Sequence, residues 1–109
     1  MKKILLVLGV VFPVLLMAQG SLLIIGGGSE SDEAGGWSTE PYSWAVAQSA
    51  NKRVAIISYS TASDWMRNYF VDHCGAASAK DFKLNSKTIA DNQETYDSLM
   101  TYDVIFLKG

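Results

Sequence analysis

Three short segments rich in glycine, serine and threonine carry the residues of this 109-residue chain that are best suited to chemistry. Each segment follows an apolar run of the kind that forms a buried strand. Small residues let backbone N–H groups approach a ligand closely, and hydroxyls supply donors and acceptors. One such loop could equally be a tight turn, but three together favour a ligand site. The candidate loop residues are Gly27, Gly28, Ser60, Thr61 and Gly109.

The first of these loops also carries three carboxylates, at Glu30, Asp32 and Glu33. Carboxylates repel a pyrophosphate, and the loop lacks the third glycine of the dinucleotide motif G-x-G-x-x-G because Ser31 stands in its place. The chain has no Gly-Lys-Ser or Gly-Lys-Thr triplet for a phosphate-binding loop. An acidic rim would favour a substrate with cationic groups, so these carboxylates are candidates for binding such a group, but a solvated acidic loop is the interpretation that we favour.

The cysteine, the histidine and the net charge exclude several other kinds of function. A single cysteine, Cys74, and a single histidine, His73, cannot form an internal disulfide or a four-ligand Cys/His zinc site. Both precede Gly75 at the end of a predicted helix, where we expect Cys74 to be a small buried residue rather than a nucleophile. We expect neither a metal nor a cofactor. A net charge of −2 without a basic run argues against nucleic acid as a partner.

The elements that must position the three loops alternate along the chain. Continuous apolar runs with abrupt polar or glycine ends predict strands buried on both faces. Apolar residues at helical spacing between them predict helices. We expect Trp37, Trp44 and Trp65 in the core, with the lining of a pocket as the alternative. This order predicts an α/β layer fold with a mostly parallel sheet. We expect strands at 22–25, 53–58, 80–84 and 104–107. We expect helices at 41–51 and at 65–73, the second of which ends at Gly75. A third, short helix should begin at a capping box formed by Asp91 and Glu94.

Residues 1–20 have the three parts of a secretory signal peptide. Two lysines precede an apolar run over 4–17, and small residues follow it. The run is shorter than the roughly 20 apolar residues of a membrane span, which is the alternative. We expect cleavage after Ala18 or Gly20, and we expect residues 21–109 to be exported without a stable membrane span.

The apolar run 104–107 bears on whether the domain is complete. A parallel strand as apolar as this one needs helices on both faces, and two residues follow it. We therefore expect residues 21–109 to be the N-terminal part of a single α/β domain, truncated after its fourth strand. A complete small domain that leaves this strand uncovered is the alternative.

Four segments of the chain occur in an order and spacing that together carry a family resemblance. They are Leu23–Glu30, Lys52–Tyr59, Trp65 with Asn68–Phe70, and Val104–Gly109. In this order they resemble the N-terminal half of the cyanophycinase-like serine peptidases. The resemblance implies a three-layer α/β fold of the class I glutamine amidotransferase (flavodoxin-like) type. It also implies a serine-type exopeptidase that cleaves aspartyl peptide bonds, such as those of β-linked Asp-Arg units, without a metal.

The resemblance implies that the catalytic serine and histidine lie outside this chain. Gly109 would be the first glycine of a Gly-Gly-Asp-Gln turn near the oxyanion site, and the serine would follow on a Gly-x-Ser-Ala-Gly elbow. The chain alone is then expected to be inactive, and its acidic loop would suit an arginine-bearing peptide. Export leaves the substrate open between released cyanophycin and other Asp-containing peptides. The second hypothesis is a secreted flavodoxin-like binding module, and the third is a truncated relative that is stable only with another chain.

Overall fold

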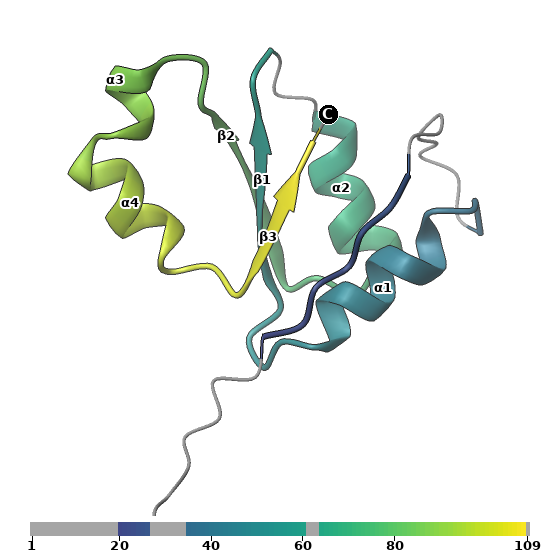
Figure 1. The fold of residues 1–109 in the computed structure, drawn as a ribbon. Coiled ribbons are helices and arrows are strands. Elements are labelled where there is room, and N and C mark those ends of the chain that lie inside the picture. The colour runs from purple at the N-terminus through teal and green to yellow at the C-terminus, as the bar shows by residue number, and fades with distance from the viewer. Residues whose placement is uncertain (1–19, 27–34, 61–63, 109) are drawn as a thin grey trace, which may run out of the picture.

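The structure is a computed structural model that describes residues 20–26, 35–60 and 64–108 (Figure 1). The predicted leader at 1–20 therefore lies, except for Gly20, outside the described residues. In the described part, no helix is long and apolar enough to cross a membrane. Its elements are α1 (Thr39–Ala47), β1 (Arg53–Ser58), α2 (Asp64–His73), β2 (Ser78–Lys83), α3 (Lys87–Ala90), α4 (Gln93–Leu99) and β3 (Val104–Leu107).

The three strands form one open parallel sheet in the order β2-β1-β3. In the central strand β1, Ile56 lies opposite Asp81 of β2 and Phe106 of β3. Val54, Ala55 and Ile56 have no exposed surface. A central parallel strand is covered on both faces, which explains why β1 is a continuous apolar run rather than an alternating one. The predicted mixed α/β fold with a parallel sheet is confirmed.

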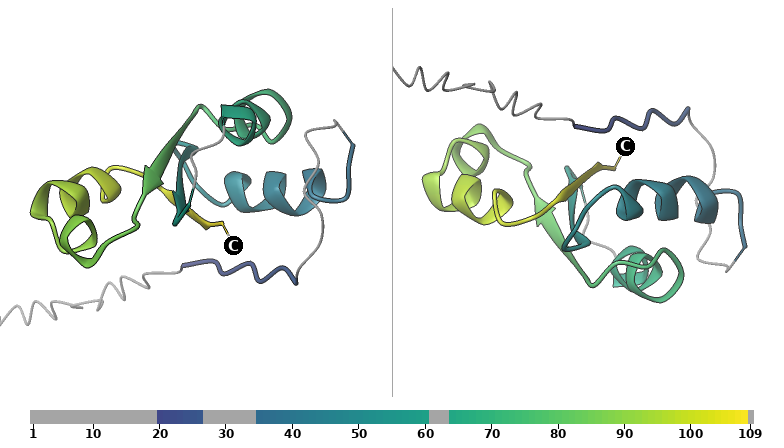
Figure 2. Two further views of the ribbon diagram at one scale, coloured as in Figure 1. Left: turned by 90° about the horizontal axis from the view of Figure 1, so that it is seen from above. Right: turned by 90° about the horizontal axis from the view of Figure 1, so that it is seen from below.

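Helices lie on both sides of the sheet. In the two views of Figure 2, the α3–α4 pair and α1 lie on opposite sides of the strands. Val104 and Phe106 of β3 pack into the core that α1 and α2 form. Ile105 and Leu107, which alternate with them, are 48% and 73% exposed. One face of β3 is therefore packed and the other is largely uncovered.

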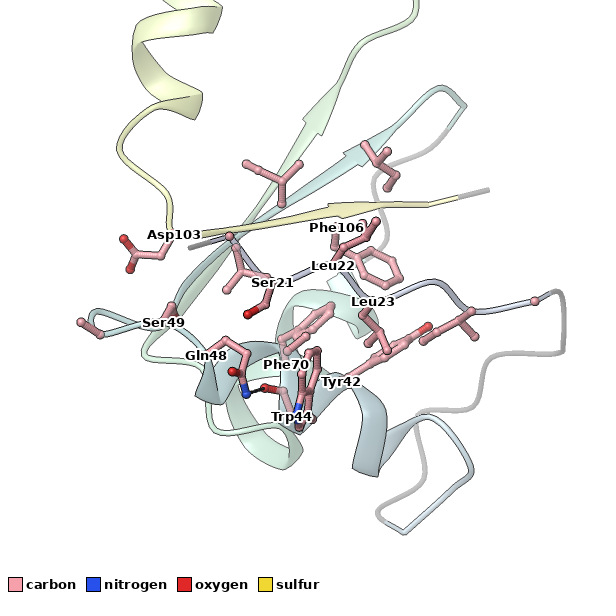
Figure 3. Close-up of a pocket in the computed structure, with 18 of the residues that line it drawn as sticks. Ser21, Leu22, Leu23, Tyr42, Trp44, Gln48, Ser49, Phe70, Asp103 and Phe106 are labelled. Atoms are coloured by element: carbon pink, nitrogen blue, oxygen red, sulfur yellow. Dashed lines mark hydrogen bonds between the residues drawn. The ribbon is translucent and has the colours of Figure 1, made fainter. Parts of the chain in front are cut away.

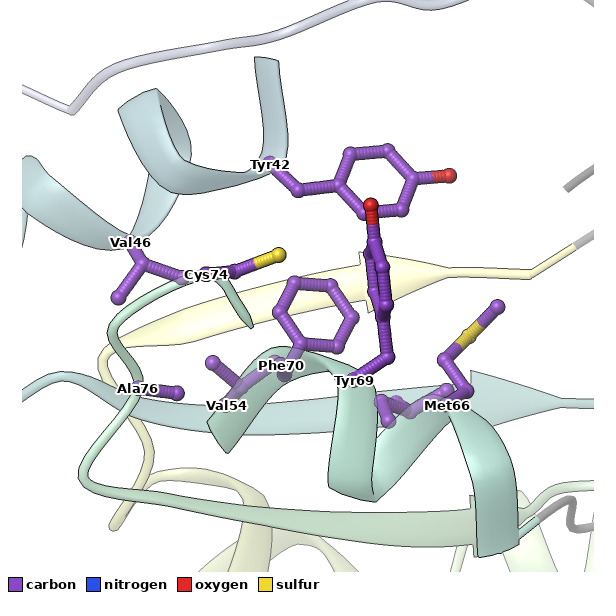
Figure 4. Close-up of a cluster of buried hydrophobic side chains, with 9 residues drawn as sticks. Tyr42, Val46, Val54, Met66, Tyr69, Phe70, Cys74 and Ala76 are labelled. Carbon is purple, nitrogen blue, oxygen red and sulfur yellow. The ribbon is translucent and has the colours of Figure 1, made fainter. Parts of the chain in front are cut away.

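The core between α1, α2 and the sheet contains a cluster of aromatic rings among aliphatic side chains (Figure 4). Tyr42 of α1 stacks on Phe70 of α2 with ring centroids 5.4 Å apart. Phe106 of β3 meets these two rings edge-on, at 5.0 and 5.3 Å. Met66 lies four residues before Phe70, so both point to the same face of α2, as helical spacing requires.

Residues 22–25, which we predicted to be the first strand, are not a strand in the structure. They are extended beside β3 but are not part of its ladder. Leu22 and Ile24 are 80% and 82% exposed. The prediction was wrong because an apolar run indicates a tendency to be buried, whereas a strand also needs backbone hydrogen bonds to a neighbouring edge.

Local hydrogen bonds shift the ends of other elements. α1 ends at Ala47, before the end of the helix predicted at 41–51. The reason is that the N–H and the hydroxyl of Ser49 both donate to the carbonyl of Val46, at 3.1 and 3.0 Å. β2 begins two residues before the predicted strand at 80–84. The predicted stop after α2 is confirmed, since Gly75 has a φ of 78°, a conformation that glycine adopts at little cost.

The segment between β2 and β3 contains two short helices where we predicted one. Asp91 is not the cap of the second helix, because the side chain of Asn92 accepts from the N–H of Glu94 at 2.8 Å instead. In the additional helix α3, the hydroxyl of Ser86 accepts from the N–H of Ile89 at 3.3 Å. Serine and asparagine are strong N-caps because their side-chain oxygens bond the otherwise unpaired first N–H groups of a helix.

Candidate functional site

The carboxyl ends of the three strands meet at one edge of the sheet. After β3, the N–H of Lys108 donates to the carbonyl of Ile57 at 2.9 Å, and after β2 the N–H of Leu84 donates to the carbonyl of Ser58 at 2.9 Å. In open parallel sheets, ligands bind at this edge because the strands lead into their loops there. We therefore take this edge as the candidate site.

Among the residues predicted for the site, Ser60 is the one that the structure describes. It is exposed and lies two residues beyond the end of β1. Lys108 ends the described chain at the same edge, next to the predicted Gly109. The remaining predicted residues lie outside the described part of the chain: Gly27, Gly28, Glu30, Asp32, Glu33, Thr61 and Gly109.

Ser58 is a residue of this edge that sequence analysis left out of the site. It is 4% exposed, and its hydroxyl has no hydrogen-bond partner among the described residues. The sheet register places Lys83 on one side of it, and the hydrogen bond of Lys108 to β1 places that residue on the other. A buried hydroxyl without a partner is rare in a core and is more typical of a functional or hydrated site. The signal that could have identified it is its position as the polar end of an apolar strand.

An ion pair between α2 and β2 lies near the same edge. Arg67 Nε is 2.9 Å from Asp81 Oδ2, and the side chains are 40% and 7% exposed. Lys108 Nζ lies 5.9 Å from the centre of the Trp65 ring, near the outer limit of a cation–π contact. Together with Lys83, the described side chains of this region carry more positive than negative charge. The edge therefore favours an anionic group of a ligand.

Burial raises the pKa of the Asp81 carboxyl, although the charges of Arg67 and Lys108 act in the opposite direction. The folded protein therefore binds this proton more tightly than the unfolded chain does. The resulting stability is fully present below the unfolded pKa and is lost as the pH rises through the folded pKa.

We expect Asp81→Asn, which does not titrate, to gain stability relative to the wild type as the pH rises from about 3 to about 7. Urea denaturation of both proteins across this range measures the difference in unfolding free energy. Asp72→Asn, at an exposed position of α2, is the control and should give a flatter difference. If the unfolding free energy of Asp81→Asn fell relative to that of the wild type as the pH rises, the Arg67 charge would outweigh burial in its effect on the pKa of Asp81.

Cys74 and His73 lie away from the candidate edge. α2 begins after the carboxyl end of β1, so its last residue, His73, and the following Cys74 are at the opposite edge. Cys74 is buried, as predicted, and burial raises the pKa of its thiol, which disfavours the nucleophilic thiolate. Within the described ranges, no three Asp, Glu, His or Cys side chains are grouped so that they could hold a metal ion.

A cavity of about 1010 Å³ lies between α1, β3 and residues 20–26 (Figure 3). Trp37 and Trp44, which we expected in the core, line it and are 47% and 45% exposed. The expectation failed for Trp44 because Tyr42 and Val46 occupy the core face of α1, and a residue midway between them points elsewhere. The cavity combines aromatic walls with an open side.

Comparisons with protein-family models, with curated proteins and with solved structures find no match for this chain. The functional assignment therefore depends on the geometry of the site and on the residue pattern. The candidate edge offers the hydroxyls of Ser58 and Ser60 and the positive charges of Lys83 and Lys108. These groups can bind and orient an anionic or carbonyl-bearing ligand.

Proposed function

We propose that this chain forms the N-terminal part of an exported serine-type exopeptidase of cyanophycinase type, which hydrolyses aspartyl peptide bonds next to arginine. Residues after 109 supply the nucleophilic serine and its histidine. This chain supplies the edge of the sheet that frames the oxyanion and the substrate, with a flavodoxin-like arrangement of the complete domain. Gly27, Gly28, Ser60, Thr61 and Gly109 are the proposed framing residues.

The observation that carries the proposal is the meeting of the strand ends at one edge. The hydrogen bond from Lys108 to Ile57 keeps the loops after β1 and β3 adjacent, as a site assembled from both would require. The positive charges of Lys83 and Lys108 suit the carboxylate of an aspartyl substrate. The carboxylates of the loop 30–33 suit the guanidinium of its arginine.

The test begins with the codons that follow residue 109 in the coding DNA. We expect Gly-Asp-Gln at once and a Gly-x-Ser-Ala-Gly elbow with a later histidine. The protein expressed from the whole reading frame should hydrolyse a β-linked Asp-Arg dipeptide, and replacing the elbow serine with alanine should abolish this activity. The chain 1–109 alone should be inactive. A reading frame without the elbow would refute the proposal.

A variant within this chain tests the charge argument. Lys108→Gln in the complete protein should raise KM about two- to fivefold, because one partly exposed positive charge near the substrate carboxylate is lost. Lys87→Gln is the matched control, since Lys87 is an exposed lysine on α3 whose charge pairs with Asp91. Equal effects of the two substitutions would show that Lys108 has no specific part in binding.

The second candidate function is a secreted binding module without hydrolytic activity. The observation that favours it is the cavity beside α1, whose aromatic walls suit a small apolar ligand. The absence of a serine elbow after residue 109 would favour this function over the peptidase.

A further inference from the structure

The buried hydroxyl of Ser58 indicates a binding site at the carboxyl edge of the sheet. We propose that this edge binds a small carboxylate, which accepts a hydrogen bond from Ser58 Oγ and lies between the charges of Lys83 and Lys108. This names the chemical group that the edge holds, and it rests on the proposed function for the place of that group in the reaction. The binding itself involves described residues alone, so it can be tested without hydrolysis.

The two serines Ser38 and Ser58 are both buried, but they differ in their partners. Ser38 is 1% exposed, and its hydroxyl oxygen is 3.0 Å from that of Tyr69. Ser58 is 4% exposed, and its hydroxyl has no hydrogen-bond partner among the described residues. A buried hydroxyl without a partner costs free energy, and a ligand that accepts a hydrogen bond from it removes that cost. The hydroxyl of Ser58 therefore suits a ligand better than a structural role.

Alternation along the strands places Ser58 in a row of polar side chains on the face that α2 covers. Ile56 belongs to the core on this face, so Ser58, two residues further along β1, points to the same side. The register puts Lys83 of β2 opposite Ser58. Phe106 of β3 also packs against this core, so Lys108, again two residues further, continues the row. On this face the three strands therefore end in lysine, serine and lysine.

The start of α2 lies next to the ends of β1 and β3 and brings a third positive charge to the row (Figure 1). Lys108 Nζ is 5.9 Å from the centre of the Trp65 ring, and Arg67 Nε is 2.9 Å from Asp81 Oδ2. Burial raises the pKa of Asp81, and the charges of Arg67 and Lys108 act against it, so both charges are close to this carboxyl. Among the described side chains here, three cations with Lys83 included face one acidic group, so the row attracts an anion.

A carboxylate matches the number and kind of groups in this row. One of its oxygens can accept from the Ser58 hydroxyl while the other faces the ammonium of Lys83 or Lys108. Hydrogen bonds to an ionised oxygen are roughly twice as strong as those between neutral groups. A phosphate group has more oxygens to satisfy and is usually held by several backbone N–H groups, whereas this row supplies a single hydroxyl.

Binding of succinate to the 109-residue chain at constant ionic strength, followed by NMR at single amides, tests the proposal. We expect a Kd on the order of millimolar, with shifts of the amides of Ser58 and Lys108. Succinamide has the same shape without the charge and should shift neither amide. No shift with succinate, or equal shifts with both compounds, would overturn the proposal.

Two lysines of β2 provide matched variants because they lie on opposite faces of the strand. Lys83 belongs to the row, whereas Lys80 Nζ lies over the Phe82 ring on the other face. Lys83→Gln should weaken succinate binding about two- to fivefold, and Lys80→Gln should leave it unchanged. Asp81→Asn removes the negative charge of the row and should strengthen binding by about the same factor. Equal effects of the two lysine substitutions, or weaker binding by Asp81→Asn, would contradict the proposed site.

Ser58→Ala separates binding from stability. It should weaken succinate binding about tenfold, because the hydrogen bond to a charged oxygen is lost. It should not lower the midpoint of urea denaturation, because no partner within the described protein is lost. Ser38→Ala, which loses its bond to Tyr69, is the matched control and should lower the midpoint without changing succinate binding. A midpoint that falls as far in Ser58→Ala as in Ser38→Ala would show a structural role for Ser58 and overturn the proposal.

Failure of this site and failure of the proposed function give different results. Succinate binding by a protein whose reading frame lacks the serine elbow would support the carboxylate site and refute the peptidase. Hydrolysis of the Asp-Arg dipeptide by the complete protein, combined with no succinate binding by the 109-residue chain, would support the peptidase and overturn the carboxylate site.

Discussion

Truncating Phe70 to alanine is expected to lower the free energy of unfolding by about 3–5 kcal/mol. Phe70 is 1% exposed, and its ring lies against those of Tyr42 and Phe106 at 5.4 and 5.3 Å. No neighbour can fill the space without moving one of these rings, so a cavity remains. Natural domains are stable by about 5–15 kcal/mol, so this loss removes a large part of the total. Urea denaturation followed by circular dichroism measures it.

Tyr96→Ala is the matched control for this prediction. It removes an aromatic ring from a helix, as Phe70→Ala does, but Tyr96 of α4 is 55% exposed. Its expected cost is below about 1 kcal/mol, because most of its ring is already in water. Similar costs for the two variants would show that the packing around Phe70 does not carry the stability of the domain.

Removing the hydroxyl of Tyr69 is expected to cost about 1–3 kcal/mol. This hydroxyl is 3.0 Å from Ser38 Oγ and 2.7 Å from Thr39 Oγ1, and it joins α2 to the start of α1. Ser38 is 1% exposed, so in Tyr69→Phe its hydroxyl loses its partner without access to water. The penalty for a buried unpaired hydroxyl, rather than the lost bond itself, dominates the cost.

A double-mutant cycle checks this explanation. In Ser38→Ala with Tyr69→Phe, both polar partners are gone, so the double variant should lose less than the sum of the two single losses. The expected difference is about 0.5–2 kcal/mol. Additive losses in urea denaturation would show that the two hydroxyls do not depend on each other.

The sequence by itself determined the elements whose causes are local. The continuous apolar runs at 53–58 and 104–107 identified β1 and β3. For the central strand β1, the reason is that a strand covered on both faces has no polar face. Gly75 identified the end of α2, because few other residues adopt its positive φ. The alternation of such runs with helical spacing was sufficient to predict a parallel α/β sheet.

The tertiary structure alone decided which of these elements touch. The run 22–25 is as apolar as β1, but it is not a strand of the sheet, whose edge strand β3 is about eighty residues away in the chain. The pairing of Arg67 with Asp81 and the placement of Ser58 between Lys83 and Lys108 likewise join residues from different elements. Strand order, register and the faces of helices are set by long-range packing, and residue types along the chain do not record that packing.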